Sequence, residues 1–189
     1  DDIGATLSSI SMYSDALKQQ VKETLPHLEP VLDKMGENSR DMVNSMSDIV
    51  WAINPNNDDG NKLIQRMESY ARDLCSMKNI LLQFNADESI GTMNLPLEYR
   101  KNIYLIFKES LNNALKYSGA KQIQITLSRQ QGKFSMNIED NGAGFDIKTA
   151  NNGNGLINIV ERAKEIKGQS LIDSAVGKGT LVKFSCPLP

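Results

Sequence analysis

The 189-residue chain has few of the residues that form disulfide or metal frameworks: two cysteines, Cys75 and Cys186, and one histidine, His27. The cysteines lie far apart and form no short-spaced metal motif, so we expect reduced thiols in a cytoplasmic protein. No apolar run approaches the roughly 20 residues that span a bilayer, and no signal peptide is visible. The 21 basic and 23 acidic residues nearly balance, with no run of Lys or Arg. This pattern disfavours a nucleic-acid partner.

The length and one cluster of turn-forming residues indicate two modules. A chain of 189 residues allows one large domain or two small ones. The segment Asn54-Pro-Asn-Asn-Asp-Asp-Gly60 interrupts a helical pattern with residues that favour turns. We therefore predict a first domain over residues 1–57 and a second over residues 61–189.

The first module carries apolar residues at spacings that alternate between four and three, which is typical of a helical bundle. The pattern breaks near Pro26 and resumes, which predicts two helices in an antiparallel hairpin. A lone hairpin would leave much of this stripe in water, whereas pairing two copies into a four-helix bundle buries it. The alternative is that the stripe packs on the second module. Its members are Ile3, Leu7, Ile10, Leu17, Val21, Leu28, Leu32, Met35, Met42, Met46, Ile49 and Ile53, with Ser14 and Ser39 in the gaps.

The second module mixes helical and strand patterns. Helical spacing and alternation of apolar residues predict helices at 62–78, 96–117 and 156–168, and strands at 80–84, 123–127, 134–138, 170–173 and 180–186. Elements mixed in this way predict an α/β sandwich, in which a mixed sheet is covered by helices on one face. The whole chain is therefore predicted to be an α+β protein.

One helical face of the second module carries groups that suit a magnesium nucleotide. Glu109, Asn113 and Tyr117 are spaced by four residues and share a face. Magnesium prefers oxygen ligands and keeps several waters, so the Asn113 carbonyl and phosphate oxygens are sufficient ligands. Glu109 can orient a metal-bound water or act as a base. Asn112 and Lys116 lie on the adjacent stripe, from which Lys116 could reach a phosphate. Taken alone, this helix is better explained by a solvated polar face.

Two glycine turns follow in the sequence. Asp140 ends a strand and precedes Gly142 and Gly144, whose small size lets a backbone approach a flat ligand closely. The carboxylate can accept a hydrogen bond from the exocyclic amine of adenine, although an Asx turn would also explain Asn141-Gly142. Gly153-Asn-Gly155 then opens a helix, where unpaired N–H groups and the helix dipole favour phosphate. A glycine-rich linker is the alternative for this second turn.

These stretches, in this order and followed by Gly177-Lys-Gly179-Thr180, resemble the ATP-binding domain of two-component sensor histidine kinases, within the larger group shared with gyrase, the Hsp90 chaperones and MutL. The resemblance implies ATP and Mg²⁺ as ligands, with metal at Asn113, chemistry assisted by Glu109 and adenine bound by Asp140. It assigns the loop from Gly153 through Gly155 to Leu156 to the phosphates, and places Thr180 near the adenine. Only seven residues separate Phe145 from Gly153, which is typical of a short-lid subfamily.

The same resemblance extends to the start of the chain. Asp1-Asp-Ile-Gly-Ala5 is similar to the stretch that follows the phospho-accepting histidine in this subfamily, so we expect that histidine just before Asp1, outside this sequence. Asp1 would then polarise it for attack on the γ-phosphate. His27, at the hairpin turn without a following acid, is expected to be a surface residue. Any membrane anchor is expected in a missing N-terminal part.

We therefore expect the catalytic core of a sensor histidine kinase. It would form a homodimer and transfer the γ-phosphoryl group of ATP to histidine and then to an aspartate on a response-regulator receiver domain. An ATPase or serine kinase with the same nucleotide fold is one rival, which the helical hairpin disfavours. A non-catalytic dimerisation module is another, which the intact Glu109, Asn113 and Asp140 disfavour.

Overall fold

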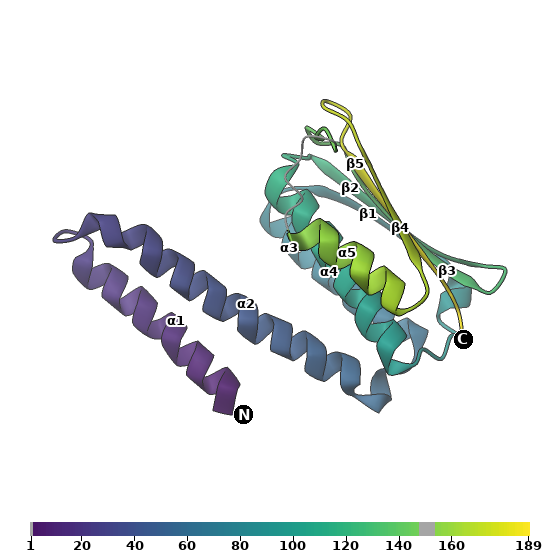
Figure 1. Ribbon diagram of the computed structural model, residues 1–189, viewed down its shortest axis with the longest axis horizontal. Coiled ribbons are helices and arrows are strands. Elements are labelled where there is room, and N and C mark those ends of the chain that lie inside the picture. Colours follow the sequence, from purple (N-terminus) through teal and green to yellow (C-terminus); the bar gives the residue numbers. More distant parts are fainter. Residues whose placement is uncertain (1, 148–153) are drawn as a thin grey trace. The chain divides into compact units, whose positions relative to one another are not determined.

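The computed structural model describes residues 2–147 and 154–189, and the chain divides into two compact units, residues 1–54 and 55–189 (Figure 1). Each unit has its own helices, and the second also has the sheet. The division falls within the segment of turn formers from Asn54 to Gly60. In the described part of the chain, no helix combines the length and the apolar character that crossing a membrane requires.

The first unit is a hairpin of two helices. Helix α1 spans Asp2–Val21, a short 3-10 turn η1 spans Pro26–Leu28, and α2 spans Glu29–Ile53. The two helices run side by side in opposite directions in Figure 1. Proline lies in the first turn of α2, where its missing N–H costs no helical hydrogen bond. The predicted antiparallel hairpin is confirmed, and His27 lies exposed in η1.

Small polar residues make part of the contact between α1 and α2, and several apolar residues of the predicted pattern are not buried in it. The hydroxyl of Ser14 donates to the Leu32 carbonyl, and that of Ser39 donates to the Leu7 carbonyl. Seven apolar side chains of the predicted pattern remain between 39% and 65% exposed. We call them the apolar stripe: Ile3, Ile10, Leu17, Met35, Met42, Ile49 and Ile53.

Among its described residues, the second unit contains three α-helices and one five-stranded sheet. After a 3-10 turn η2 (Pro55–Asn57) come α3 (Gly60–Met77), β1 (Leu81–Ala86), η3 (Glu88–Ile90), α4 (Leu97–Tyr117), β2 (Gln122–Gln130), β3 (Lys133–Asp140), α5 (Asn154–Glu165), β4 (Gln169–Ser174) and β5 (Thr180–Pro187). The strand order is β1-β2-β3-β5-β4. Among the described strands, β1 and β2 pair in parallel and the other three pairings are antiparallel, so the predicted mixed sheet is confirmed.

The three helices α3, α4 and α5 cover one face of the sheet (Figure 1). The core lies between these layers, because alternate residues of β2, β3 and β5 point toward the helices. Its most enclosed members include Ile103, Phe107, Ile125, Phe134 and Ile159. This arrangement brings the C-terminal half of α4 beside the end of β3 and the start of β5.

Helix α3 begins two residues before the predicted helix, at Gly60. The Asp59 side chain caps it by accepting a hydrogen bond from the Asn61 N–H at 2.8 Å. A Cβ at Gly60 would lie 2.0 Å from the Ile90 carbonyl oxygen. This glycine therefore serves close backbone packing, whereas the sequence pattern suggested a turn.

Candidate nucleotide-binding site

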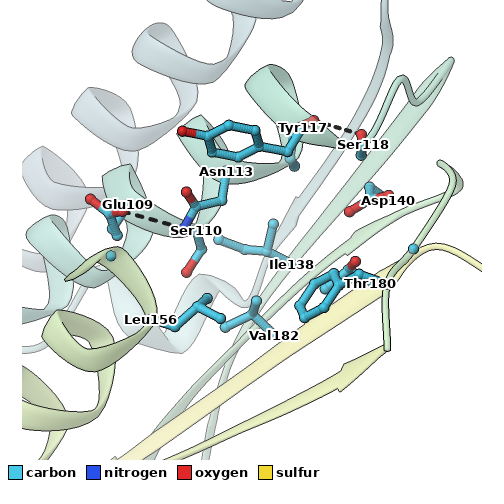
Figure 2. A pocket seen from close by; sticks show the side chains of 14 residues that line it. Glu109, Ser110, Asn113, Tyr117, Ser118, Ile138, Asp140, Leu156, Thr180 and Val182 are labelled. Carbon is cyan, nitrogen blue, oxygen red and sulfur yellow. Dashed lines mark hydrogen bonds between the residues drawn. The ribbon is translucent and has the colours of Figure 1, made fainter. Parts of the chain in front are cut away.

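A cavity of about 510 Å³ opens between α4, the start of α5 and the ends of β3 and β5. Figure 2 shows helix residues on one side of it and strand residues on the other. Seven of the predicted ligands line it: Glu109, Asn113, Asp140, Gly144, Gly155, Leu156 and Thr180. They come from four separate stretches of the sequence, so the fold brings together groups that the chain keeps up to about seventy residues apart.

Helix α4 supplies the polar groups on one side of the cavity. Asn113 Nδ2 donates a hydrogen bond to Glu109 Oε1 at 3.3 Å, across one helical turn (Figure 2). Because this bond uses the amide nitrogen, the carbonyl oxygen of Asn113 is the atom left to bind a cation. Tyr117, one turn further along, lines the outer part of the cavity and is 79% exposed.

Asp140 supplies a buried acid on the opposite side. Its side chain is at the end of β3 and the residue is only 5% exposed. Burial raises the pKa of the Asp140 carboxyl, and hydrogen bonds from the backbone N–H groups of Gly142 and Thr180 and from Ser118 oppose this rise. The Gly142 N–H donates to Asp140 Oδ1 at 2.9 Å. The carboxyl group is thus held in one orientation toward the cavity.

Two glycine turns interlock beside Asp140. Gly144 has a left-handed φ of +58°, and a Cβ there would lie 2.1 Å from the Ala175 carbonyl oxygen. Gly179, in the turn between β4 and β5, has φ of +76°, and a Cβ there would lie 2.0 Å from the Asp140 carbonyl oxygen. The Gly177 N–H donates to the Ala143 carbonyl at 2.6 Å. The two turns therefore fix each other and the backbone around Asp140.

The first turn of α5 closes the cavity on its third side. A Cβ at Gly155 would lie 2.1 Å from Glu109 Oε1 and 3.4 Å from Asn113 Nδ2. Glycine here lets the start of α5 approach both polar side chains of α4. Any larger residue would have to displace the Glu109 carboxylate.

Three other predicted ligands are not among the described residues that line the cavity: Asn112, Lys116 and Gly142. Asn112 accepts a hydrogen bond from the Tyr70 hydroxyl at 3.2 Å, and Lys116 is exposed on α4. Gly142 packs against the Ser118 carbonyl, where a Cβ would lie 2.3 Å away, and so shapes the turn after Asp140. Asp1 and Gly153 lie outside the described residues.

Seven further described residues line the cavity that sequence analysis did not name as ligands: Ser110, Ala114, Tyr117, Ser118, Ile138, Phe145 and Val182. Strand alternation could have identified two of them, Ile138 and Val182. Ile138 is two residues before Asp140 on β3, and Val182 two residues after Thr180 on β5, so each pair shares a face of its strand. These apolar side chains therefore line the cavity next to Asp140 and Thr180.

Comparison with known proteins agrees with this geometry. Residues 98–189 match the family described as histidine kinase-, DNA gyrase B- and HSP90-like ATPases. The sensor histidine kinase YhcY of Bacillus subtilis is 26% identical over 190 aligned positions, which cover 100% of this chain and 48% of YhcY. The chain is similar to sensor histidine kinases, and residues 98–189 belong to this ATPase family. Its second unit is therefore a domain of an ATP-binding family.

Other relatives extend this similarity. The sensor histidine kinase YdfH of Bacillus subtilis is 35% identical over 98 residues, covering 50% of this chain and 24% of YdfH. The chain thus spans about half or less of the length of these curated relatives. The histidine kinase domain of the Erythrobacter litoralis EL346 blue-light activated histidine kinase has the same fold, with a TM-score of 0.62 at 19% identity, covering 97% of this chain and 94% of that one.

Proposed function

We propose that this chain is the catalytic core that moves the γ-phosphoryl group of ATP to a histidine side chain, placed just before Asp1 in the longer protein. A second transfer would carry it to an aspartate on a response-regulator receiver domain. The observation that carries the proposal is the meeting of Glu109, Asn113 and Asp140 around one cavity. These are the groups that metal binding, proton transfer and adenine recognition require.

Asp140 is proposed to bind the base. Its carboxylate accepts hydrogen bonds only, so it would pair with the 6-amino group of adenine and disfavour the 6-oxo group of guanine. Thr180, paired with Asp140 across β3 and β5, would lie beside the same edge of the base. Ile138, Leu156 and Val182 provide apolar contacts.

The phosphates are proposed to lie toward the first turn of α5. Backbone N–H groups at a helix start are unpaired within the helix and attract anions. Gly155 lines the cavity there, and we assign the loop that includes Gly153 to the same role. Lys116, exposed one turn after Asn112 on α4, would provide a point charge near the phosphates. Asn112 is proposed as a further polar contact.

The site fits Mg²⁺ through Asn113. In the described part of the chain, no group of three His, Cys, Asp or Glu side chains is placed to hold a metal ion. A cation that takes most of its ligands from phosphates and water needs only one protein oxygen, which Asn113 Oδ1 can supply. When bound, Mg²⁺ neutralises phosphate charge during transfer. Glu109 would accept the proton of the attacking group or of an ordered water, and Asp1 would polarise the acceptor histidine.

Two copies of the chain are proposed to associate through the helical hairpin of the first unit. The apolar stripe on α1 and α2 would pair with that of a second copy to form a four-helix bundle. We propose that this homodimer belongs to the cytoplasmic portion of a membrane-anchored sensor, as the resemblance to sensor kinases implies.

Replacing Asn113 with alanine should remove the magnesium dependence of ATP binding. Wild-type affinity, measured by titration calorimetry with Mg²⁺ and with a chelator, should differ by about tenfold or more, since metal sites lose about 10- to 100-fold when a supporting group is removed. Asn113→Ala should bind ATP equally in both conditions. Asn137→Ala is the matched control, because Asn137 is exposed on β3 and is not among the described residues that line the cavity. A full magnesium effect in Asn113→Ala would reject the metal assignment.

Phosphoryl transfer is tested by substituting Glu109 in a chain that carries a histidine before Asp1. That chain should incorporate acid-labile phosphate from γ-labelled ATP. Glu109→Gln should slow labelling about a hundredfold or more, since a positioned acid or base contributes about 10²–10⁴-fold. Glutamine has the same shape beside Gly155, so ADP affinity should stay unchanged. Equal labelling of the variant would remove Glu109 from the mechanism.

A further inference from the structure

Three residues form a row across neighbouring strands at one edge of the cavity. Asp140 on β3 is paired with Thr180 on β5, and Thr180 is paired with Ser174 on β4. Asp140 and Thr180 line the cavity, whereas Ser174 is not among the described residues that line it. Figure 2 shows Asp140 and Thr180 together on the strand side. Ser174 therefore lies next to Thr180 on the neighbouring strand, and it would not contact a ligand in the cavity.

The hydroxyl of Ser174 contacts three groups. The Phe145 N–H donates to Ser174 Oγ at 2.9 Å, Ser174 Oγ lies 3.0 Å from the Gly179 carbonyl oxygen, and it lies 3.0 Å from Thr180 Oγ1. A serine hydroxyl has one proton to donate and two lone pairs to accept with. Phe145 occupies one lone pair, and the Gly179 carbonyl, which can only accept, takes the proton.

After these two hydrogen bonds, Ser174 Oγ has one lone pair left with which to accept a hydrogen bond from Thr180. The third contact is a hydrogen bond only if the Thr180 hydroxyl donates its proton to Ser174. The Thr180 proton then points toward β4, away from the cavity. Toward a ligand, Thr180 therefore presents a lone pair. It acts as a hydrogen-bond acceptor, as the neighbouring Asp140 carboxylate does.

We propose that Ser174 is a positioning residue for base selectivity: by taking the Thr180 proton, it makes Thr180 an acceptor toward the ligand. Two acceptors side by side favour a 6-amino group and disfavour a 6-oxo group on a purine. Without the Ser174 hydroxyl, Thr180 could rotate and donate to a 6-oxo oxygen. This inference deepens the proposed nucleotide site and rests on it.

The test compares ADP with inosine diphosphate, whose base carries a 6-oxo group in place of the 6-amino group. Kd values from titration calorimetry give a selectivity ratio for each variant. Ser174→Ala should lower this ratio about two- to tenfold, the effect of about 0.5–1.5 kcal/mol per hydrogen bond. It also removes the acceptor for the Phe145 N–H, but that loss affects both nucleotides alike. Ser174→Thr retains a hydroxyl and should restore the ratio.

Two controls separate proton direction from general damage to β4. Ser170 lies on the same face of β4, and its buried hydroxyl has no hydrogen-bond partner among the described residues, so Ser170→Ala should keep the wild-type ratio. In a Thr180→Val background, Ser174→Ala should no longer change the ratio, because the hydroxyl that it directs is gone. An unchanged ratio in Ser174→Ala, or an equal change with and without Thr180, would overturn the inference. If wild-type protein binds neither nucleotide, the proposed function itself fails.

Discussion

Replacing Asp140 with alanine is expected to weaken ADP binding by about 10- to 100-fold, with or without Mg²⁺. A hydrogen bond to a charged group contributes about 1.5–3 kcal/mol, and every 1.4 kcal/mol is a factor of about ten in Kd. Asp140 is 5% exposed and accepts from the Gly142 N–H, so its carboxylate is held in place before the ligand arrives. Titration calorimetry with ADP and GDP checks the expectation, because the variant should also lose most of its preference for adenine.

Glu139 offers the matched control for this substitution. It carries the same charge one residue earlier on β3. However, it is exposed, and its side chain projects from the opposite face of the sheet. Glu139→Ala should bind ADP like the wild type. Adenine recognition at Asp140 would be rejected if Asp140→Ala bound ADP within about twofold of the wild type.

Replacing both Met42 and Ile49 with aspartate is expected to convert the proposed dimer to a monomer of 21.0 kDa. Both side chains belong to the apolar stripe and are 58% and 44% exposed in one chain. In a four-helix bundle, two uncompensated charges per chain would enter an apolar interface, which should weaken association by at least about a hundredfold. Light scattering over a range of concentrations measures the change.

Met12→Asp is the control for dimerisation. Met12 is 71% exposed on α1, two residues after Ile10 and so on a different face of the helix. This variant should remain dimeric. Both variants should keep wild-type ADP affinity, because the cavity residues belong to the other unit. A wild-type chain that stays monomeric at all concentrations would contradict the bundle.

The elements were predictable where their periodicity was strong. The 3.6-residue spacing of α4 and the alternation of β2 and β3 set both their type and the face that each buries. The parallel pairing of β1 with β2 was not predictable from either strand, because a strand's own pattern does not specify its neighbour's direction. Gly60 was misplaced for a related reason: only the tertiary structure reveals that the Ile90 carbonyl requires a glycine there.

The candidate site, like the fold, could be predicted only in part. That Glu109, Asn113 and Asp140 meet at one cavity could be anticipated, because the resemblance to the kinase family placed them in one site. The role of Ser174 was hidden, because its three partners come from the segment after β3, the β4–β5 turn and β5, and only folding brings them to one hydroxyl. Ser118 and Ser110 were hidden as well, because small residues on a helix give no signal of what they face.

The serine-to-carbonyl contacts between α1 and α2 have a consequence for how the hairpin folds. Because small polar residues occupy part of that contact, one hairpin buries little hydrocarbon on its own. If two copies pair as proposed, most of the free energy that orders these helices comes from the partner. The folded fraction of the hairpin then obeys mass action and rises with protein concentration, whereas the ATP-binding domain, with its own core, does not depend on it.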